Sequence, residues 1–198
     1  LALKKDIEQD DGTYRHQYTT GFPAPTLLAC SFDPDLIFSV GKAIGREMQE
    51  YGVSFCLTPG CALLRTPFDA VSQESWSEDA VLSGICALFF CKGVQTHAAA
   101  VLRAGTLPHS LELSLSAFRD VYGLPFEIAA GACKAFLLPD SSVNGESLGE
   151  DSSLIRSLIL DWKYSGMFLS DGERYSQEPD RIVLERSALR IVRVMMQQ

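Results

Sequence analysis

The sequence lacks the features that mark a membrane or secreted protein. No apolar run reaches the roughly 18 residues that a membrane span requires, and the longest candidate, Ala80 to Cys91, is amphipathic. The segment from Leu1 to Asp11 carries two lysines and four acidic residues, unlike a signal peptide. The single asparagine, Asn144, precedes Gly-Glu and forms no N-glycosylation sequon. We therefore expect no transmembrane segment, and the localisation stays open.

Excess positive charge and metal-ligand spacings are also missing. The 17 basic and 25 acidic residues give a net charge of −8, which argues against nucleic acid or an anionic membrane as the main partner. The six cysteines form no CxxC pair, and the three histidines lie far from any zinc-type spacing. We therefore expect no metal, no organic cofactor and six buried free thiols, because free cysteine packs as a small hydrophobe. His97 and His109 are expected to be structural.

Apolar and helical patterns alternate along the chain. Of its 198 residues, 46% are hydrophobic and 21% charged, which is typical of a globular domain with a substantial core. Helices are expected over 34–51, 79–95, 115–123, 125–130, 152–162 and 180–196, and strands over 53–57, 98–102, 134–138 and 167–169. This alternation predicts a parallel sheet with crossover helices. A complete (β/α)8 barrel needs about 250 residues, so we expect a partial or trimmed (β/α)8 TIM-barrel-like domain or an open sheet.

The first of these helices has clear boundaries in the sequence. Asp33 is a suitable N-cap before Pro34 at the first helical position, and Gly52 is a suitable stop. Its inward face is expected to consist of residues at four-residue spacing, namely Leu36, Val40, Ile44 and Met48.

A series of short motifs resembles glycoside hydrolase family 3, the β-glucosidase family. The segment 21–36, GFPAPTLLACSFDPDL, is similar to the family's "FPAP…LAASFDPEL", and 40–47, VGKAIGRE, is similar to "VGRAIGRE". Further similarities follow in family order: the stretch 52–67, SED at 77–79, GVQ at 93–95, LPFE at 124–127, VNG at 143–145, LSD at 169–171 and RIVRV at 190–194. The resemblance implies that residues 1–198 form one incomplete N-terminal barrel domain without the C-terminal domain.

The resemblance implies a retaining β-glucosidase mechanism, in which two carboxylates lie about 5–5.5 Å apart. Asp171, the aspartate of the "SDW" motif, corresponds to the nucleophile, and the alternative is a simple turn with Gly172. A carbohydrate or glycoside is the implied substrate, and Asp11, Arg65, Glu74 and Arg103 are the implied substrate-binding residues. For Asp11, a solvated turn is an equally good interpretation.

Several family residues are replaced, which predicts weak activity. Val71 stands where the family has a sugar-binding arginine, Ala104 stands for a histidine, Asp140 for a tyrosine and Gly172 for a tryptophan. The family's acid/base carboxylate usually comes from a second domain, so a partner chain or a missing C-terminal domain is expected to supply it.

Three alternatives stay open for the activity. Glu146, Glu173 or Glu178 could substitute for the acid/base carboxylate, with nothing in their spacing to favour one. The chain could be an impaired family member that acts as a sugar-binding or protein-interaction scaffold. It could also be an enzyme repurposed for a glycosylated small molecule.

Overall fold

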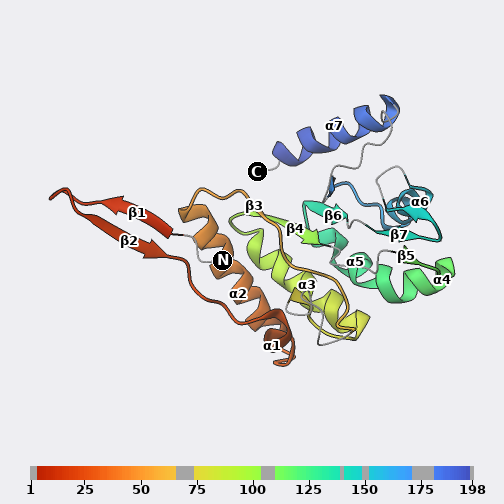
Figure 1. Ribbon diagram of the computed structural model, residues 1–198, viewed down its shortest axis with the longest axis horizontal. Coiled ribbons are helices and arrows are strands. Elements are labelled where there is room, and N and C mark those ends of the chain that lie inside the picture. The colour runs from red at the N-terminus through yellow and green to blue at the C-terminus, as the bar shows by residue number, and fades with distance from the viewer. Residues whose placement is uncertain are drawn as a thin grey trace.

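A parallel four-stranded sheet lies at the centre of the computed structural model, which describes residues 4–65, 74–103, 110–138, 141–148, 152–170 and 181–196 (Figure 1). Its strands are β3 (Phe55–Cys56), β4 (Ala99–Arg103), β6 (Ala135–Leu138) and β9 (Met167–Ser170), in the order β3-β4-β6-β9. Spatial order follows chain order, as in a barrel wall. The structure thus confirms the predicted partial barrel.

The two faces of this sheet bury different residues, as expected for alternating side chains. Ala100, Leu102 and Phe136 face a core built with the helices α2 (Pro34–Glu50), α3 (Ala80–Val94) and α5 (Leu124–Ala129). On the other face, Val101, Ala135 and Met167 pack with Val194 of α7 (Arg181–Met195). Figure 1 shows α7 on the side of the sheet opposite α2 and α3.

Helix α2 has the predicted ends. The Asp33 side chain accepts hydrogen bonds from the backbone N–H groups of Asp35 and Leu36, Pro34 opens the helix, and Gly52 follows it with a left-handed φ of 71°. The helix packs closely on α3, because a Cβ at Gly41 would lie 2.5 Å from the carbonyl oxygen of Phe90. Only glycine permits this backbone approach.

The remaining helices are short or lie at the edges. They are α1 (Pro25–Ala29), α4 (Leu115–Ala117), a π-helical segment (Phe118–Gly123), a 3-10 turn (Ala130–Ala132) and α6 (Ser153–Trp162). The sequence predicted helices over 115–123 and 125–130, and the structure has four consecutive segments of three helical types over 115–132. None of the helices in the described ranges is long and apolar enough to cross a membrane.

Two small sheets were not predicted. The hairpin of β1 (Lys4–Glu8) and β2 (Tyr14–Tyr18) extends away from the rest of the chain (Figure 1). A second sheet joins β5 (Ser110–Leu111), β7 (Ser142–Val143) and β8 (Glu146–Ser147). Asn144, with φ 53°, links this sheet to the loop before α4: its side chain accepts from Leu113 N–H at 2.9 Å and donates to Leu113 C=O at 2.8 Å.

All six cysteines are free thiols, as predicted, and five of them are buried. The prediction is wrong for Cys30, which is exposed. Cys30 is the C-cap of the five-residue helix α1, where the chain turns through the exposed residues 30–33 toward α2. Its apolar sequence neighbours therefore do not cover it.

Candidate functional site

The carboxyl edge of the sheet holds two of the residues that the sequence singled out, Arg103 and Glu74. Strands β4, β6 and β9 are parallel and end at Arg103, Leu138 and Ser170. Leu138 pairs with Ser170, so these two strands end at the same level. Asp171 directly follows Ser170 and lies outside the described residues. In barrel enzymes, chemistry takes place at this edge because the loops that follow the strands converge there.

Arg103 and Glu74 form an ion pair at this edge. The distance from Arg103 Nη1 to Glu74 Oε2 is 2.7 Å, and the two side chains are 30% and 50% exposed. The Arg103 backbone is fixed in turn, because its N–H donates to Pro59 and its C=O accepts from Cys61 at 2.8 Å. The structure thus brings together two of the predicted substrate-binding residues, and their predicted contact with sugar stays a prediction.

This ion pair offers a sugar hydroxyl both a hydrogen-bond donor and a hydrogen-bond acceptor. Arginine presents five N–H donors, and the contact with one carboxylate oxygen of Glu74 leaves other donors available. The second oxygen of Glu74 can accept from a hydroxyl group. A half-exposed donor–acceptor pair of this kind suits a polyhydroxylated ligand better than an apolar one.

Arg65 contacts an aromatic ring, and its predicted contact with sugar stays a prediction. Its guanidinium lies over the ring of Tyr122, with 5.1 Å between the guanidinium carbon and the ring centroid, and the residue is exposed. Tyr122 belongs to the π-helical segment 118–123. A cation over an aromatic face at an exposed position contributes about 0.5–1 kcal/mol. This contact joins the loop after β3 to the helical layer.

Asp11 lies in the turn of the exposed β1–β2 hairpin, and the structure does not bring it to Arg103 (Figure 1). Its carboxylate accepts from Thr13 N–H at 2.9 Å and from the Thr13 hydroxyl at 2.6 Å. The hydroxyl hydrogen bond, more than the backbone one, holds the pKa of Asp11 below its ordinary value. These contacts are those of a solvated turn.

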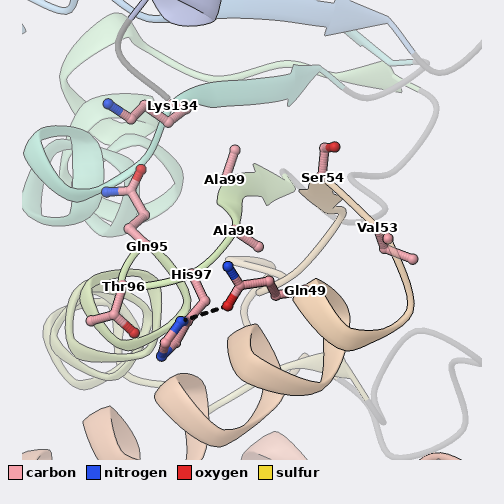
Figure 2. A pocket seen from close by; sticks show the side chains of 10 residues that line it. Gln49, Val53, Ser54, Gln95, Thr96, His97, Ala98, Ala99 and Lys134 are labelled. Carbon is pink, nitrogen blue, oxygen red and sulfur yellow. Dashed lines mark hydrogen bonds between the residues drawn. The ribbon is translucent and has the colours of Figure 1, made fainter.

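A pocket of about 400 Å³ lies at the opposite, amino edge of the sheet (Figure 2). Its lining comes from the ends of α2 and α3 and from the residues before β3, β4 and β6, including Gln49, Ser54, His97 and Lys134. His97 Nδ1 lies 3.1 Å from Gln49 Oε1, so this histidine links the two helix ends. Because the pocket is at the amino edge, we do not assign it to the sugar site.

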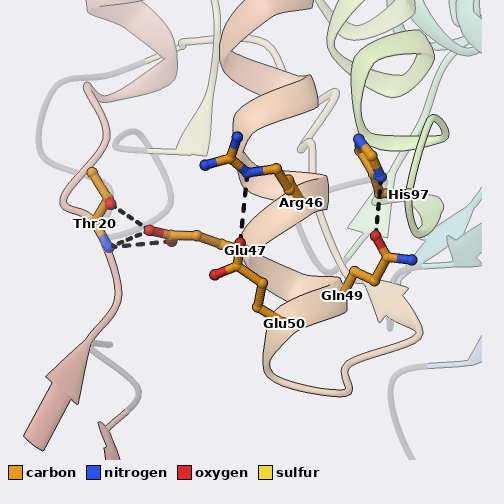
Figure 3. A network of polar contacts seen from close by, with 6 residues as sticks. All are labelled: Thr20, Arg46, Glu47, Gln49, Glu50 and His97. Atoms are coloured by element: carbon orange, nitrogen blue, oxygen red, sulfur yellow. Dashed lines mark hydrogen bonds and ion pairs between the residues drawn. The ribbon is translucent and has the colours of Figure 1, made fainter.

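The polar contacts around α2 are structural. Figure 3 shows Glu47 accepting from Thr20 N–H, which ties the chain after β2 to the helix, and Arg46 paired with Glu50 at 3.6 Å. Exposed pairs at i, i+4 contribute about 0.3–0.5 kcal/mol. None of these groups is at the carboxyl edge.

The described part of the chain shows no cluster of metal ligands, and its buried cysteines are poor nucleophiles. Across the described ranges, no group of three or more His, Cys, Asp or Glu side chains could hold a metal ion. Burial raises the pKa of Cys56 and of Cys86 to about 11, and that of Cys133 to about 12. A thiol with such a pKa is not a nucleophile at neutral pH.

Comparison with known proteins identifies the family. The glycosyl hydrolase family 3 N-terminal domain matches residues 1–108, more than half of the chain. The chain belongs to glycosyl hydrolase family 3. Probable beta-glucosidase I of Aspergillus fumigatus is 32% identical over 162 residues, and probable beta-glucosidase J of Neosartorya fischeri is 33% identical over 165 residues. These alignments cover 76% and 75% of this chain and 19% of each relative.

Solved family 3 structures share the fold. Beta-glucosidase 3B from Thermotoga neapolitana, solved with glycerol, has a TM-score of 0.75 and 28% identity over 91% of this chain and 27% of its own. The same enzyme solved with glucose has a TM-score of 0.73. The Bifidobacterium adolescentis family 3 beta-glucosidase has a TM-score of 0.79 at 24% identity, covering 88% of this chain and 32% of its own. The family assignment made from sequence motifs is thereby confirmed, and the chain spans about a fifth of the curated relatives' length.

Proposed function

We propose that residues 1–198 form an incomplete barrel domain of a retaining β-glucosidase-type hydrolase that binds a β-linked glucoside at its carboxyl edge. The observation that carries this proposal is the Arg103–Glu74 pair, which lies at the sheet edge where β9 leads into Asp171. The names of the family 3 relatives, and the glucose bound by the Thermotoga enzyme, support the choice of substrate.

In the proposed mechanism, a carboxylate oxygen of Asp171 attacks the anomeric carbon and the glycosidic C–O bond breaks. A second carboxyl group protonates the departing oxygen, and water then hydrolyses the glycosyl ester on Asp171. Arg103 would donate to a sugar hydroxyl, and Glu74 would accept from another. Such contacts hold the anomeric carbon in reach of the nucleophile, which is a large part of catalysis.

The acid partner is proposed to come from another chain or domain. Glu146 was one alternative, but its carboxylate accepts from Ser153 N–H at 2.5 Å and from the Ser153 hydroxyl at 2.7 Å. These bonds engage both carboxylate oxygens of Glu146 at the start of α6, so the side chain already serves as a helix cap. Glu173 and Glu178 lie outside the described residues.

The test separates the nucleophile from the missing acid by the choice of leaving group. A 2,4-dinitrophenyl β-glucoside releases the stable dinitrophenolate anion, which needs no protonation, whereas the alkoxide leaving group of an alkyl β-glucoside must be protonated by an acid. We expect the chain to release dinitrophenol slowly, to lose this activity in Asp171→Asn, and to leave methyl β-glucoside intact.

Asp120→Asn, a change at an exposed helical carboxylate, is the matched control and should retain full activity. Trapping of one fluoroglycosyl group per chain by a 2-deoxy-2-fluoro-β-glucoside, detected by mass spectrometry, would locate the covalent intermediate. Equal dinitrophenol release by the unchanged chain and Asp171→Asn would contradict the assignment of the nucleophile. Release no faster than the spontaneous rate by both proteins would favour the scaffold alternative.

A further inference from the structure

The main chain that carries Glu74 is held more firmly than the side chain itself. Ser75 and Trp76, the next two residues, are 2% and 1% exposed. The Thr26 hydroxyl donates to the Ser75 C=O at 2.7 Å, and Leu64 N–H donates to the Ser77 C=O at 3.0 Å. Glu74 therefore leaves a fixed backbone and reaches a half-exposed position beside Arg103.

Gly60 lies directly against this backbone. A Cβ at Gly60 would be 2.9 Å from the Glu74 C=O oxygen and 3.6 Å from the Glu74 Cβ. Gly60 is not one of the glycines with a positive φ, so its backbone conformation does not require glycine. Close approach to Glu74 is the remaining reason for a glycine here. Gly60 also forms a β-bridge with Arg103, so it contacts both members of the ion pair.

We propose that Gly60 and Thr26 are positioning residues of the sugar site, acting through Glu74 on the Arg103 guanidinium. Gly60 permits the Glu74 backbone to lie against the loop that bridges to Arg103, and Thr26 fixes the following peptide group. Glu74 then holds the Arg103 side chain, which otherwise samples several rotamers, in one orientation. A binding group whose rotamer is fixed in advance contributes more to affinity than a mobile one. This inference rests on the proposed function, since the site it tunes is the proposed glucoside site.

The experiment uses the full chain and four changes: Gly60→Ala, Thr26→Val, Glu74→Gln and the double variant Gly60→Ala/Glu74→Gln. Thr26→Val keeps the shape of the side chain and removes only the hydroxyl, so it serves if Gly60→Ala does not fold. Gly131→Ala is the matched control, because a Cβ at Gly131 would meet nothing within 4 Å.

Two readouts are needed. The first is the Arg103 Nε–H resonance in ¹H–¹⁵N spectra, assigned by its loss in Arg103→Lys, which reports on the ion pair without any sugar. The second is the dissociation constant for D-glucose, measured by NMR titration. A merely structural role for Gly60 or Thr26 would change the melting temperature and leave the resonance of the folded protein in place.

We expect Gly60→Ala and Thr26→Val to move the Arg103 resonance toward its position in Glu74→Gln. Each change should weaken glucose binding about three- to fivefold, which is the scale of a half-exposed ion pair. The double variant should bind no more weakly than Glu74→Gln alone, because both changes act on one contact. Gly131→Ala should match the unchanged chain in both readouts.

An unmoved Arg103 resonance in folded Gly60→Ala and Thr26→Val would overturn the inference. The inference would also be overturned if the losses of glucose affinity in Gly60→Ala and Glu74→Gln multiplied in the double variant. If the unchanged chain does not bind D-glucose at all, the proposed function fails, whereas the resonance comparison still decides whether these residues position Arg103.

Discussion

Replacement of Trp76 by phenylalanine tests the packing beneath the sugar site. Trp76 is 1% exposed, and its ring packs edge-to-face on Phe90 with 5.7 Å between centroids. Its indole Nε1–H is buried and has no hydrogen-bond partner among the described residues. Phenylalanine keeps an aromatic ring in this place and removes the N–H group.

The two effects of Trp76→Phe oppose one another. The smaller ring buries less apolar surface, which lowers the free energy of unfolding by about 1–2 kcal/mol. Removal of a buried donor without a hydrogen-bond partner raises the free energy of unfolding by about 1–3 kcal/mol. We therefore expect the free energy of unfolding to change by no more than about 1 kcal/mol. Trp76→Ala, in contrast, should cost about 3–5 kcal/mol, because it empties the same site.

Urea unfolding at 25 °C, followed by far-ultraviolet circular dichroism, measures both differences. Arg103 and Glu74 should keep their pairing in Trp76→Phe, so glucose affinity should also be unchanged. A cost of 3 kcal/mol or more for Trp76→Phe would refute the reasoning, because it would show that the indole N–H makes a bond that stabilises the core.

Three further results are expected. Gly93→Ala should cost about 1–3 kcal/mol in urea unfolding, because its Cβ would overlap the Phe38 carbonyl oxygen of α2, whereas Gly131→Ala should cost little. Cys30 should react with dithionitrobenzoate at pH 8 far faster than the five buried thiols, so Cys30→Ser should abolish the fast phase; several fast thiols would contradict the burial. Asn144→Ala should lower the unfolding free energy by about 1–2 kcal/mol through loss of both bonds to Leu113, and an unchanged urea midpoint would contradict this.

Helix positions could be predicted because their signals are local. The Asp33 cap and Gly52 define α2 within one residue of its observed end. The predicted inward face is wrong at Leu36, which is exposed, because the helix turns Ile37, Gly41 and Gly45 toward the core. Strand β3 was predicted over 53–57, yet only Phe55 and Cys56 pair. Strand length depends on the neighbouring strand, which the segment alone does not contain.

The β1–β2 hairpin has a turn signal in its sequence, although the hairpin was not predicted. Asp11–Gly12 is a hairpin-type turn, and Gly12 has a φ of 77°. The flanking segments alternate in a way that would place Asp6 opposite His16, where the two side chains pair at 2.7 Å. Its acidic composition favoured a solvated stretch instead, and charged residues on exposed strands are a known way of limiting aggregation.

Motif similarity predicted the residues of the site but did not predict their contacts. Arg103 and Glu74 were each predicted from family motifs, but their 2.7 Å pairing depends on how the loop after β3 folds back on β4. Arg65 shows the same limit, because its contact with Tyr122 joins two segments that no local pattern relates. Such contacts follow from tertiary packing, so the sequence indicates which residues matter before it indicates what they touch.

The location of the site is decided by strand direction rather than by pocket size. The 400 Å³ pocket at the amino edge contains His97 and Lys134, yet it lies where the parallel strands begin. The ion pair of Arg103 and Glu74 lies where they end, at the end of β4, and β6 separates it from β9, the strand that leads into Asp171. Loops at the carboxyl edge can vary without disturbing the strands, which is why barrel enzymes place their chemistry there. Ligand binding at the amino edge that survives both Asp171→Asn and Glu74→Gln would therefore be a separate property of this chain.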